Sequence, residues 1–108
     1  EPGETLIEAA LRETREETGW EVELEGLVGI SLYRAPANNV TYNRITFFGK
    51  PLRQIPDAEL DSAIIEPRWM TLEEIHAESA KMRSPLVLAA IEQHRKGICY
   101  PLDLIYGP

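Results

Sequence analysis

Three carboxylates share one predicted helical surface near the start of the chain. Glu13, Glu16 and Glu17 are spaced at i, i+3 and i+4, so an α-helix would hold their side chains side by side. Like charges at this spacing repel one another and weaken an isolated helix. A divalent cation removes that repulsion, and clustered carboxylate oxygens are the ligands that Mg²⁺ and Mn²⁺ prefer. The alternative interpretation is a solvated acidic face that binds nothing.

The helix that positions these carboxylates is predicted from about Thr5 to Thr18. Thr5 and Glu8 have the spacing of a capping box, and Gly19 suits the position that ends a helix. At roughly 100° per residue, a mostly apolar face forms beside the acidic one and is expected to be buried. The members of this apolar face are Ile7, Ala10, Leu11, Thr14 and Thr18.

The spacing of charges around this helix resembles the signature of the Nudix hydrolases. That signature reads Gly-x5-Glu-x7-Arg-Glu-U-x-Glu-Glu-x-Gly-U, where U is an apolar residue. The matching residues are Glu4, Arg12, Glu13, Glu16, Glu17, Gly19 and Trp20. Thr14 stands where an aliphatic residue is usual, and the leading glycine would fall before Glu1. The resemblance therefore implies upstream strands that precede the printed sequence.

The resemblance implies an enzyme that hydrolyses phosphoanhydride bonds by a metal-activated water, with Mg²⁺, or Mn²⁺, as cofactor. It assigns the metal ligands to Glu13, Glu16 and Glu17. It makes Arg12 the residue that orients them and Glu4 an acid just outside the ligand set. It also gives Glu13 or Glu17 a second task, the deprotonation of the attacking water.

The following segment alternates in a way that predicts an antiparallel β-hairpin. Apolar and polar residues alternate over residues 20–32, and a second β-rich run covers 40–49 after a turn at 35–39. Gly26 and Gly29 are expected at bulges or close approaches. With the helices, this pattern and the resemblance predict an α+β fold, a Nudix-type α/β/α sandwich with a mixed sheet. We expect residues 1–108 to form one such domain, truncated on its N-terminal side.

The hairpin also holds candidate substrate-binding residues. Arg34 and Arg44 could each meet a substrate phosphate, and Tyr42 could stack on a ring. The other interpretation is that these are ordinary polar residues of a sheet surface. A loop predicted over residues 50–60 leads to Glu59 and Asp61, and one of the two could add a metal ligand or act as the base. Solvated loop acids are the alternative for both.

The last third is predicted to contain a short strand at 64–70 and two helices. The first helix starts at Thr71, whose capping box is completed by Glu74, and the second follows the Ser84–Pro85 start signal and ends before Gly97. The tail is apolar and expected to pack on the domain. Two segments of this last third are similar to those of the NudJ-type phosphatases within the same family: Arg83-Ser84-Pro85-Leu86-Val87 and Gly97-x-x-Tyr100-Pro101-Leu102-Asp103.

That second resemblance implies a class of substrates. The NudJ-type enzymes remove phosphate from nucleoside tri- and diphosphates and from hydroxymethylpyrimidine and thiamine pyrophosphates. Two alternatives remain open at this point. One is another Nudix pyrophosphohydrolase, acting on ADP-ribose or oxidised nucleotides. The other is a catalytically silent Nudix-like module that binds a nucleotide.

Composition limits the partners of the chain. With 108 residues, a net charge of −7 and a pI near 4.8, the protein is poorly suited to nucleic-acid polymers or anionic membranes. A small phosphorylated molecule remains suitable, because a bound metal supplies local positive charge. The single cysteine, Cys99, excludes an intramolecular disulfide and fits a cytoplasmic protein. Either a monomer or a homodimer is compatible with the sequence.

Overall fold

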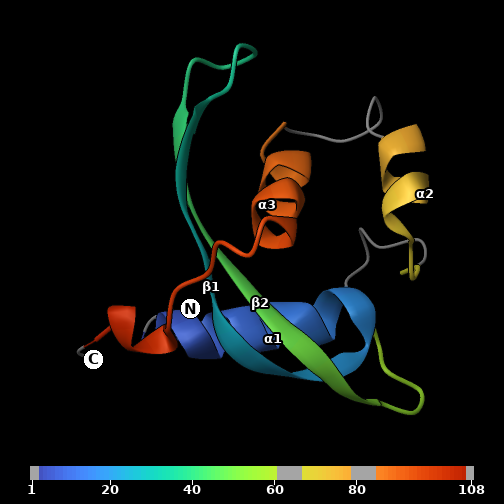
Figure 1. The fold of residues 1–108 in the computed structure, drawn as a ribbon. Coiled ribbons are helices and arrows are strands. Elements are labelled where there is room, and N and C mark those ends of the chain that lie inside the picture. Colours follow the sequence, from blue (N-terminus) through green and yellow to red (C-terminus); the bar gives the residue numbers. More distant parts are fainter. Residues whose placement is uncertain (1–2, 61–66, 79–84, 107–108) are drawn as a thin grey trace.

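A long antiparallel hairpin organises the molecule (Figure 1). The computed structural model of the chain describes residues 3–60, 67–78 and 85–106. The hairpin consists of β1 (Trp20–Arg34) and β2 (Thr41–Gln54), and α1 (Leu6–Thr18) precedes it. It is followed by α2 (Leu72–Ala77), α3 (Pro85–Arg95) and a short 3-10 helix, η2 (Leu102–Leu104).

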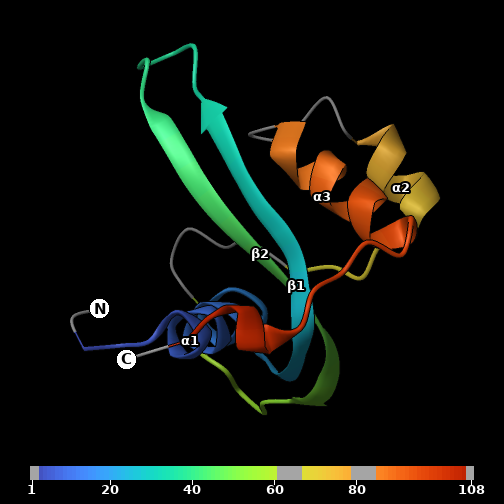
Figure 2. The same ribbon diagram turned by 60° about the vertical axis from the view of Figure 1, so that its left-hand side comes forward.

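The layers are helix, sheet and helix. Turning the molecule places α1 and α3 on opposite sides of the hairpin, with its tip extending beyond both (Figure 2). Both helices pack on β1. This is the α+β sandwich predicted above, although the sheet formed by the described residues is an antiparallel pair rather than a mixed sheet. No helix in this part of the chain is long and apolar enough to cross a bilayer.

The start and end of α1 follow from its sequence. The Thr5 hydroxyl accepts a hydrogen bond from the Glu8 amide at 3.1 Å, and the Glu8 carboxylate accepts one from the Thr5 amide at 3.0 Å. These two bonds form the predicted capping box. Gly19 ends the helix with a φ of 76°, which a side chain would disfavour. The predicted helix is therefore confirmed.

The hairpin is longer than predicted, because β2 continues through Gln54 into the expected loop. Pro51, which has no backbone N–H to donate, lies within this strand. Val22 pairs with Pro51 and Glu21 pairs with Arg53, so one residue of β2 between them has no partner and forms a β-bulge. Pro51 is accommodated because a missing N–H is tolerated beside a bulge. Further register shifts adjoin Gly26 and Gly29, as predicted. Only the remainder of the expected loop, residues 55–60, lacks regular structure.

The buried core lies in the middle of β1. Leu27 and Val28 are 1% and 4% exposed. Leu27 pairs with β2 on one side and with Tyr100 on the other, where two backbone N–H···O bonds of 2.7 Å join the tail to the sheet. The tail therefore packs at Tyr100, as expected, while Tyr106 near its end is 92% exposed.

The apolar face of α1 is less buried than predicted. No residue of this helix is fully buried, and the five residues of the predicted face are only partly covered. The reason is geometric, because two strands form too narrow a surface to cover a helix face of this width.

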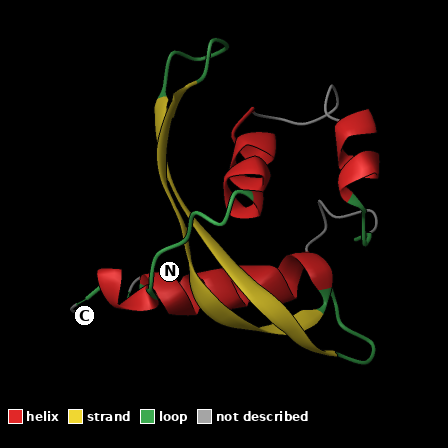
Figure 3. Cartoon of the chain, viewed as in Figure 1, coloured by secondary structure: helices red, strands yellow, loops and turns green. Residues whose placement is uncertain are grey.

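In the second half of the chain the structure has the predicted helices, but it has no strand at residues 67–70. α2 starts after Thr71, whose capping box with Glu74 forms as expected. The segment 67–70 has no regular structure, and the rest of the predicted strand, 64–66, lies outside the described residues, as does Ser84 (Figure 3). α3 begins at Pro85 and ends two residues before Gly97.

Charge is distributed unevenly over these elements. No acidic residue occurs between Glu25 and Asp57, the stretch that forms most of the hairpin, whereas four cations do: Arg34, Arg44, Lys50 and Arg53. Lys50 and Arg53 form ion pairs with Glu23 and Glu21 across the strands, at 3.2 and 3.0 Å. Arg34 and Arg44 have no ion pair with any residue that the structure describes.

Candidate active site on the first helix

Arg12 connects two of the predicted site carboxylates. Its Nε donates to both oxygens of Glu4, at 2.9 and 3.2 Å, and its Nη2 donates to Glu4 at 3.1 Å. Its Nη1 donates to both oxygens of Glu16, at 3.1 and 3.2 Å. The Glu4 side chain is 16% exposed and that of Arg12 is 25% exposed, so the pair is partly shielded from water. Arg12 therefore fixes the carboxylates of Glu4 and Glu16 relative to each other.

These contacts alter the acidity of the groups. The hydrogen bond from Arg12 lowers the pKa of Glu4, with a smaller contribution from the positive charge itself. The hydrogen bonds to Glu4 and then Glu16 raise the pKa of Arg12 further above its usual value. The contact thus favours the charged forms of both Glu4 and Arg12.

Glu13 and Glu17 complete the acidic surface of α1 and are differently placed. Both side chains are exposed, and neither has a hydrogen bond or ion pair with a residue in the described part of the chain. Their four oxygens are therefore available to a ligand. The donor set of this helix contains carboxylate oxygens only, which fits Mg²⁺ or Mn²⁺ and not a thiolate-binding metal.

The carboxylates do not by themselves enclose an ion. Within residues 3–60, 67–78 and 85–106, no three acidic, histidine or cysteine side chains are close enough together to surround a metal. A cation on this helix would therefore take several of its ligands from water and from phosphate, as Mg²⁺ usually does. Glu59, the candidate additional ligand, is exposed on its loop, and Asp61 lies outside the described residues.

The three candidate substrate-binding residues of the hairpin do not share one face. Tyr33 pairs with Tyr42 and Ser31 with Arg44, so these four side chains lie on the same face of the hairpin. Arg34 is the next residue along β1 and projects to the opposite face. The structure therefore brings Tyr42 and Arg44 together and separates Arg34 from them.

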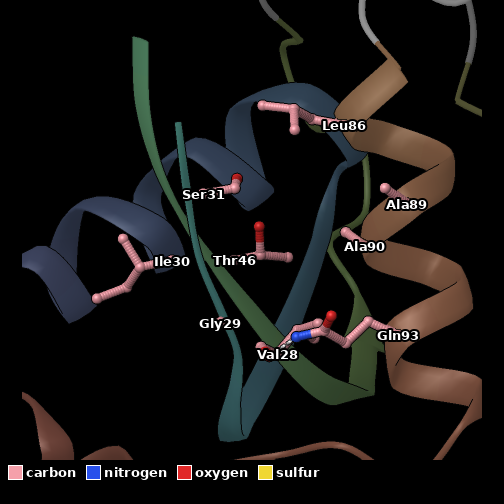
Figure 4. A pocket seen from close by; sticks show the side chains of 9 residues that line it. All are labelled: Val28, Gly29, Ile30, Ser31, Thr46, Leu86, Ala89, Ala90 and Gln93. Atoms are coloured by element: carbon pink, nitrogen blue, oxygen red, sulfur yellow. Dashed lines mark hydrogen bonds between the residues drawn. The ribbon is translucent and has the colours of Figure 1, made fainter. Parts of the chain in front are cut away.

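A pocket lies between the hairpin and α3 (Figure 4). Backbone and side chains of Val28 to Ser31 and Thr46 form one wall. Leu86, Ala89, Ala90 and Gln93 form the other. Gln93 Nε2 donates to the Val28 carbonyl at 3.1 Å, and the rings of Phe48 and His94 lie 4.8 Å apart, so α3 is held on the sheet at two points.

These pocket residues were not among those predicted from the sequence. The signal for Gln93 was available, because it follows Leu86 and Ala90 at helical spacing and so belongs to the face of α3 that meets the sheet. Ser31 and Thr46 could not have been chosen, because their common face depends on the register set by the bulges.

The chain as a whole is similar to several known proteins. A family model described as the NUDIX domain matches residues 1–90. Phosphatase NudJ of Escherichia coli strain K12 and that of Shigella flexneri are each 38% identical over 106 residues, covering 97% of this chain and 67% of theirs. A solved structure, a NUDIX hydrolase from Nitrosomonas europaea, has a TM-score of 0.96 at 41% identity and covers 100% of this chain and 73% of its own.

Proposed function

The chain belongs to the Nudix family of hydrolases, which act on pyrophosphate bonds, and on that premise we propose a Mg²⁺-dependent enzyme for small phosphorylated substrates. The substrates are nucleoside di- or triphosphates, or the pyrophosphates of hydroxymethylpyrimidine or thiamine. The similarity to the NudJ phosphatases, at 38% identity, supports this substrate class over ADP-ribose or oxidised nucleotides.

One observation carries the assignment of the site: Arg12 holds Glu4 and Glu16 while Glu13 and Glu17 remain open on the same helix. In this arrangement Glu13, Glu16 and Glu17 are the metal ligands. Glu16 is positioned by Arg12, and Glu4 fixes Arg12 from the other side. The intact set of carboxylates favours an enzyme over a module that only binds nucleotides.

The role of each residue follows from its hydrogen-bond partners. Bound Mg²⁺ would neutralise charge on the scissile phosphate and lower the pKa of an attacking water. Glu13 or Glu17 would accept the proton from that water, because neither carboxylate has a competing hydrogen bond in the described structure. Arg12 cannot take this role, since its raised pKa keeps it protonated. Arg44 of the hairpin, next to Tyr42, contacts a substrate phosphate that lies farther from the metal.

The test measures phosphate release by the full-length protein with and without Mg²⁺. We expect Glu16→Gln and Glu17→Gln to lower kcat by about 10²–10⁴-fold, the range for loss of a positioned acid or base, while circular dichroism stays unchanged. Glu92→Gln, an exposed carboxylate on α3, is the matched control and should retain activity. Near-normal Mg²⁺-dependent turnover in both site variants would remove these residues from the metal site.

A further inference from the structure

Glu17 is a proposed metal ligand that no other side chain holds in place. Arg12 Nη1 donates to both oxygens of Glu16, at 3.1 and 3.2 Å, whereas the exposed carboxylate of Glu17 has no hydrogen bond or ion pair within the described residues. Glu17 is also the last residue but one of α1, and the ends of helices fray. The position of its carboxylate therefore depends on how firmly the backbone of the last helical turn is fixed.

The hydroxyl of Thr18 fixes this last turn at two points. It donates a hydrogen bond to the Thr14 carbonyl at 2.7 Å and accepts one from the Trp20 amide at 3.1 Å. The first bond joins the last turn to the turn before it, and the second joins it to the first residue of β1. A hydroxyl carries a single proton, so the donor of Thr18 is fully used and its direction is fixed. Thr18 therefore connects the end of α1 directly to the sheet.

The corner between α1 and β1 is itself held by neighbouring segments. Gly19 is buried, its N–H donates to the Arg15 carbonyl at 2.9 Å, and its carbonyl accepts the Ile55 N–H at 2.8 Å. The rings of Trp20 and Trp69 lie 5.4 Å apart in an edge-to-face arrangement. Segments that precede and follow the hairpin thus meet at this corner, so the Trp20 amide gives the Thr18 hydroxyl a fixed point of attachment.

Thr14 has the same side chain one turn earlier but lacks this connection. Its hydroxyl donates to the Ala10 carbonyl at 2.7 Å and makes no other hydrogen bond with the described residues. Both ends of that contact lie within α1, so the Thr14 hydroxyl cannot orient the helix relative to the sheet. The two threonines therefore separate a bond inside the helix from a bond between the helix and the sheet.

From these contacts we propose that Thr18 is a positioning residue of the metal site. It holds the last turn of α1 against the start of β1 and thereby sets the direction in which the Glu17 carboxylate points. Thr18 touches neither the ion nor the substrate, and its effect reaches them only through the backbone that it shares with Glu17. The inference rests on the proposed function, since it deepens the assignment of Glu17 as a metal ligand.

The experiment measures Mn²⁺ binding by the full-length protein without substrate, with electron paramagnetic resonance reporting the free ion. Thr18→Val keeps a similar shape but removes both hydrogen bonds. It should raise the Kd for Mn²⁺ by about 10-fold, the lower end of the range for residues that orient metal ligands. Thr18→Ser keeps the hydroxyl and should restore most of the affinity. Thr14→Val makes the same chemical change one turn earlier and should leave the Kd unchanged.

Two comparisons separate positioning from stability. Thr71→Ala removes the N-cap of α2, which lowers stability at a place away from the site, and should not change the Kd. In a Glu17→Gln background, Thr18→Val should cause no further loss of affinity, because the carboxylate that it positions is absent. An unchanged affinity in Thr18→Val, a loss in Thr71→Ala, or the same loss from Thr18→Val in both backgrounds would overturn the inference. Absence of Mn²⁺ binding by the wild-type protein would instead overturn the proposed metal site.

Discussion

Gly26 is a position where a single methyl group should damage the fold. A Cβ at this residue would lie 2.6 Å from Phe48 Cε1 and 2.6 Å from the Tyr100 carbonyl oxygen, distances that real Cβ atoms do not adopt. The end of the Phe48 ring can move aside. The carbonyl cannot, because it accepts the Leu27 N–H bond of 2.7 Å that joins the tail to β1.

The cost of Gly26→Ala can be worked out from these two contacts. Overpacking of this kind costs about 1–3 kcal/mol, and each backbone hydrogen bond lost when the tail shifts at Tyr100 costs about 1 kcal/mol. We therefore expect the free energy of unfolding to fall by about 2–4 kcal/mol. In urea, with an m-value of about 2 kcal/mol per molar, the midpoint should fall by about 1–2 M.

Urea unfolding of the full-length protein, followed by tryptophan fluorescence, measures this change. Repeating the substitution in a Phe48→Leu background separates the two contacts, because the ring is then removed and the carbonyl stays. About half of the cost should persist there. A loss below about 0.5 kcal/mol in the wild-type background would refute the claim that the carbonyl is fixed, since an exposed, unconstrained site shows effects of that size.

Three further changes test the first helix. Thr5→Ala removes the side-chain half of the capping box and should lower the free energy of unfolding by about 1 kcal/mol in urea melts, whereas Thr5→Ser should cost little. The pKa of Glu4 is lowered in the folded protein, so its contribution to stability is present above its unfolded pKa, roughly 4.3, and is lost as pH falls through the lower folded value. The stability difference between wild type and Glu4→Gln should therefore be constant from neutral pH to about pH 5 and shrink below about pH 4; a difference that grows on acidification would contradict this. Arg12→Lys keeps the charge, but its single amine cannot contact both Glu4 and Glu16. The affinity for Mg²⁺, measured by calorimetry, should therefore fall about 10–100-fold. An unchanged affinity would show that Arg12 does not position the ligands.

Local signals in the sequence were enough to predict the elements whose ends are defined by short-range contacts. The helix of the acidic residues was predictable because Thr5, Glu8 and Gly19 fix both of its ends through bonds within a few residues. The ion pairs of Arg12 were partly predictable, because Glu16 lies one turn away on the same helix. Its stronger partner, Glu4, lies before the helix and could be connected with Arg12 only through the family signature.

The features that depend on pairing between distant segments were not predictable in the same way. Pro51 argued against a strand, and only the actual register shows that it falls beside a bulge. The same shifts decide which face each hairpin residue occupies, so grouping Arg34 with Tyr42 and Arg44 by sequence alone could not succeed. The pocket beside α3 requires in addition the packing of a helix that lies about 60 residues later in the chain, a separation shown by the 65-residue span of the Gln93–Val28 bond.

The acid-free stretch from Gly26 to Pro56, which forms most of the hairpin, gives the molecule an electric polarity that its net charge conceals. All eighteen acidic residues lie outside the stretch from Gly26 to Pro56, together with only seven of the eleven cations. A polyphosphate approaching at random is thus repelled by most of the surface and attracted by this stretch. Its encounters are therefore biased towards the strands that carry Arg34 and Arg44. This bias operates over about 10 Å at 0.1 M salt and fades as salt rises. An enzyme with an acidic composition can in this way collect anionic substrates from one direction.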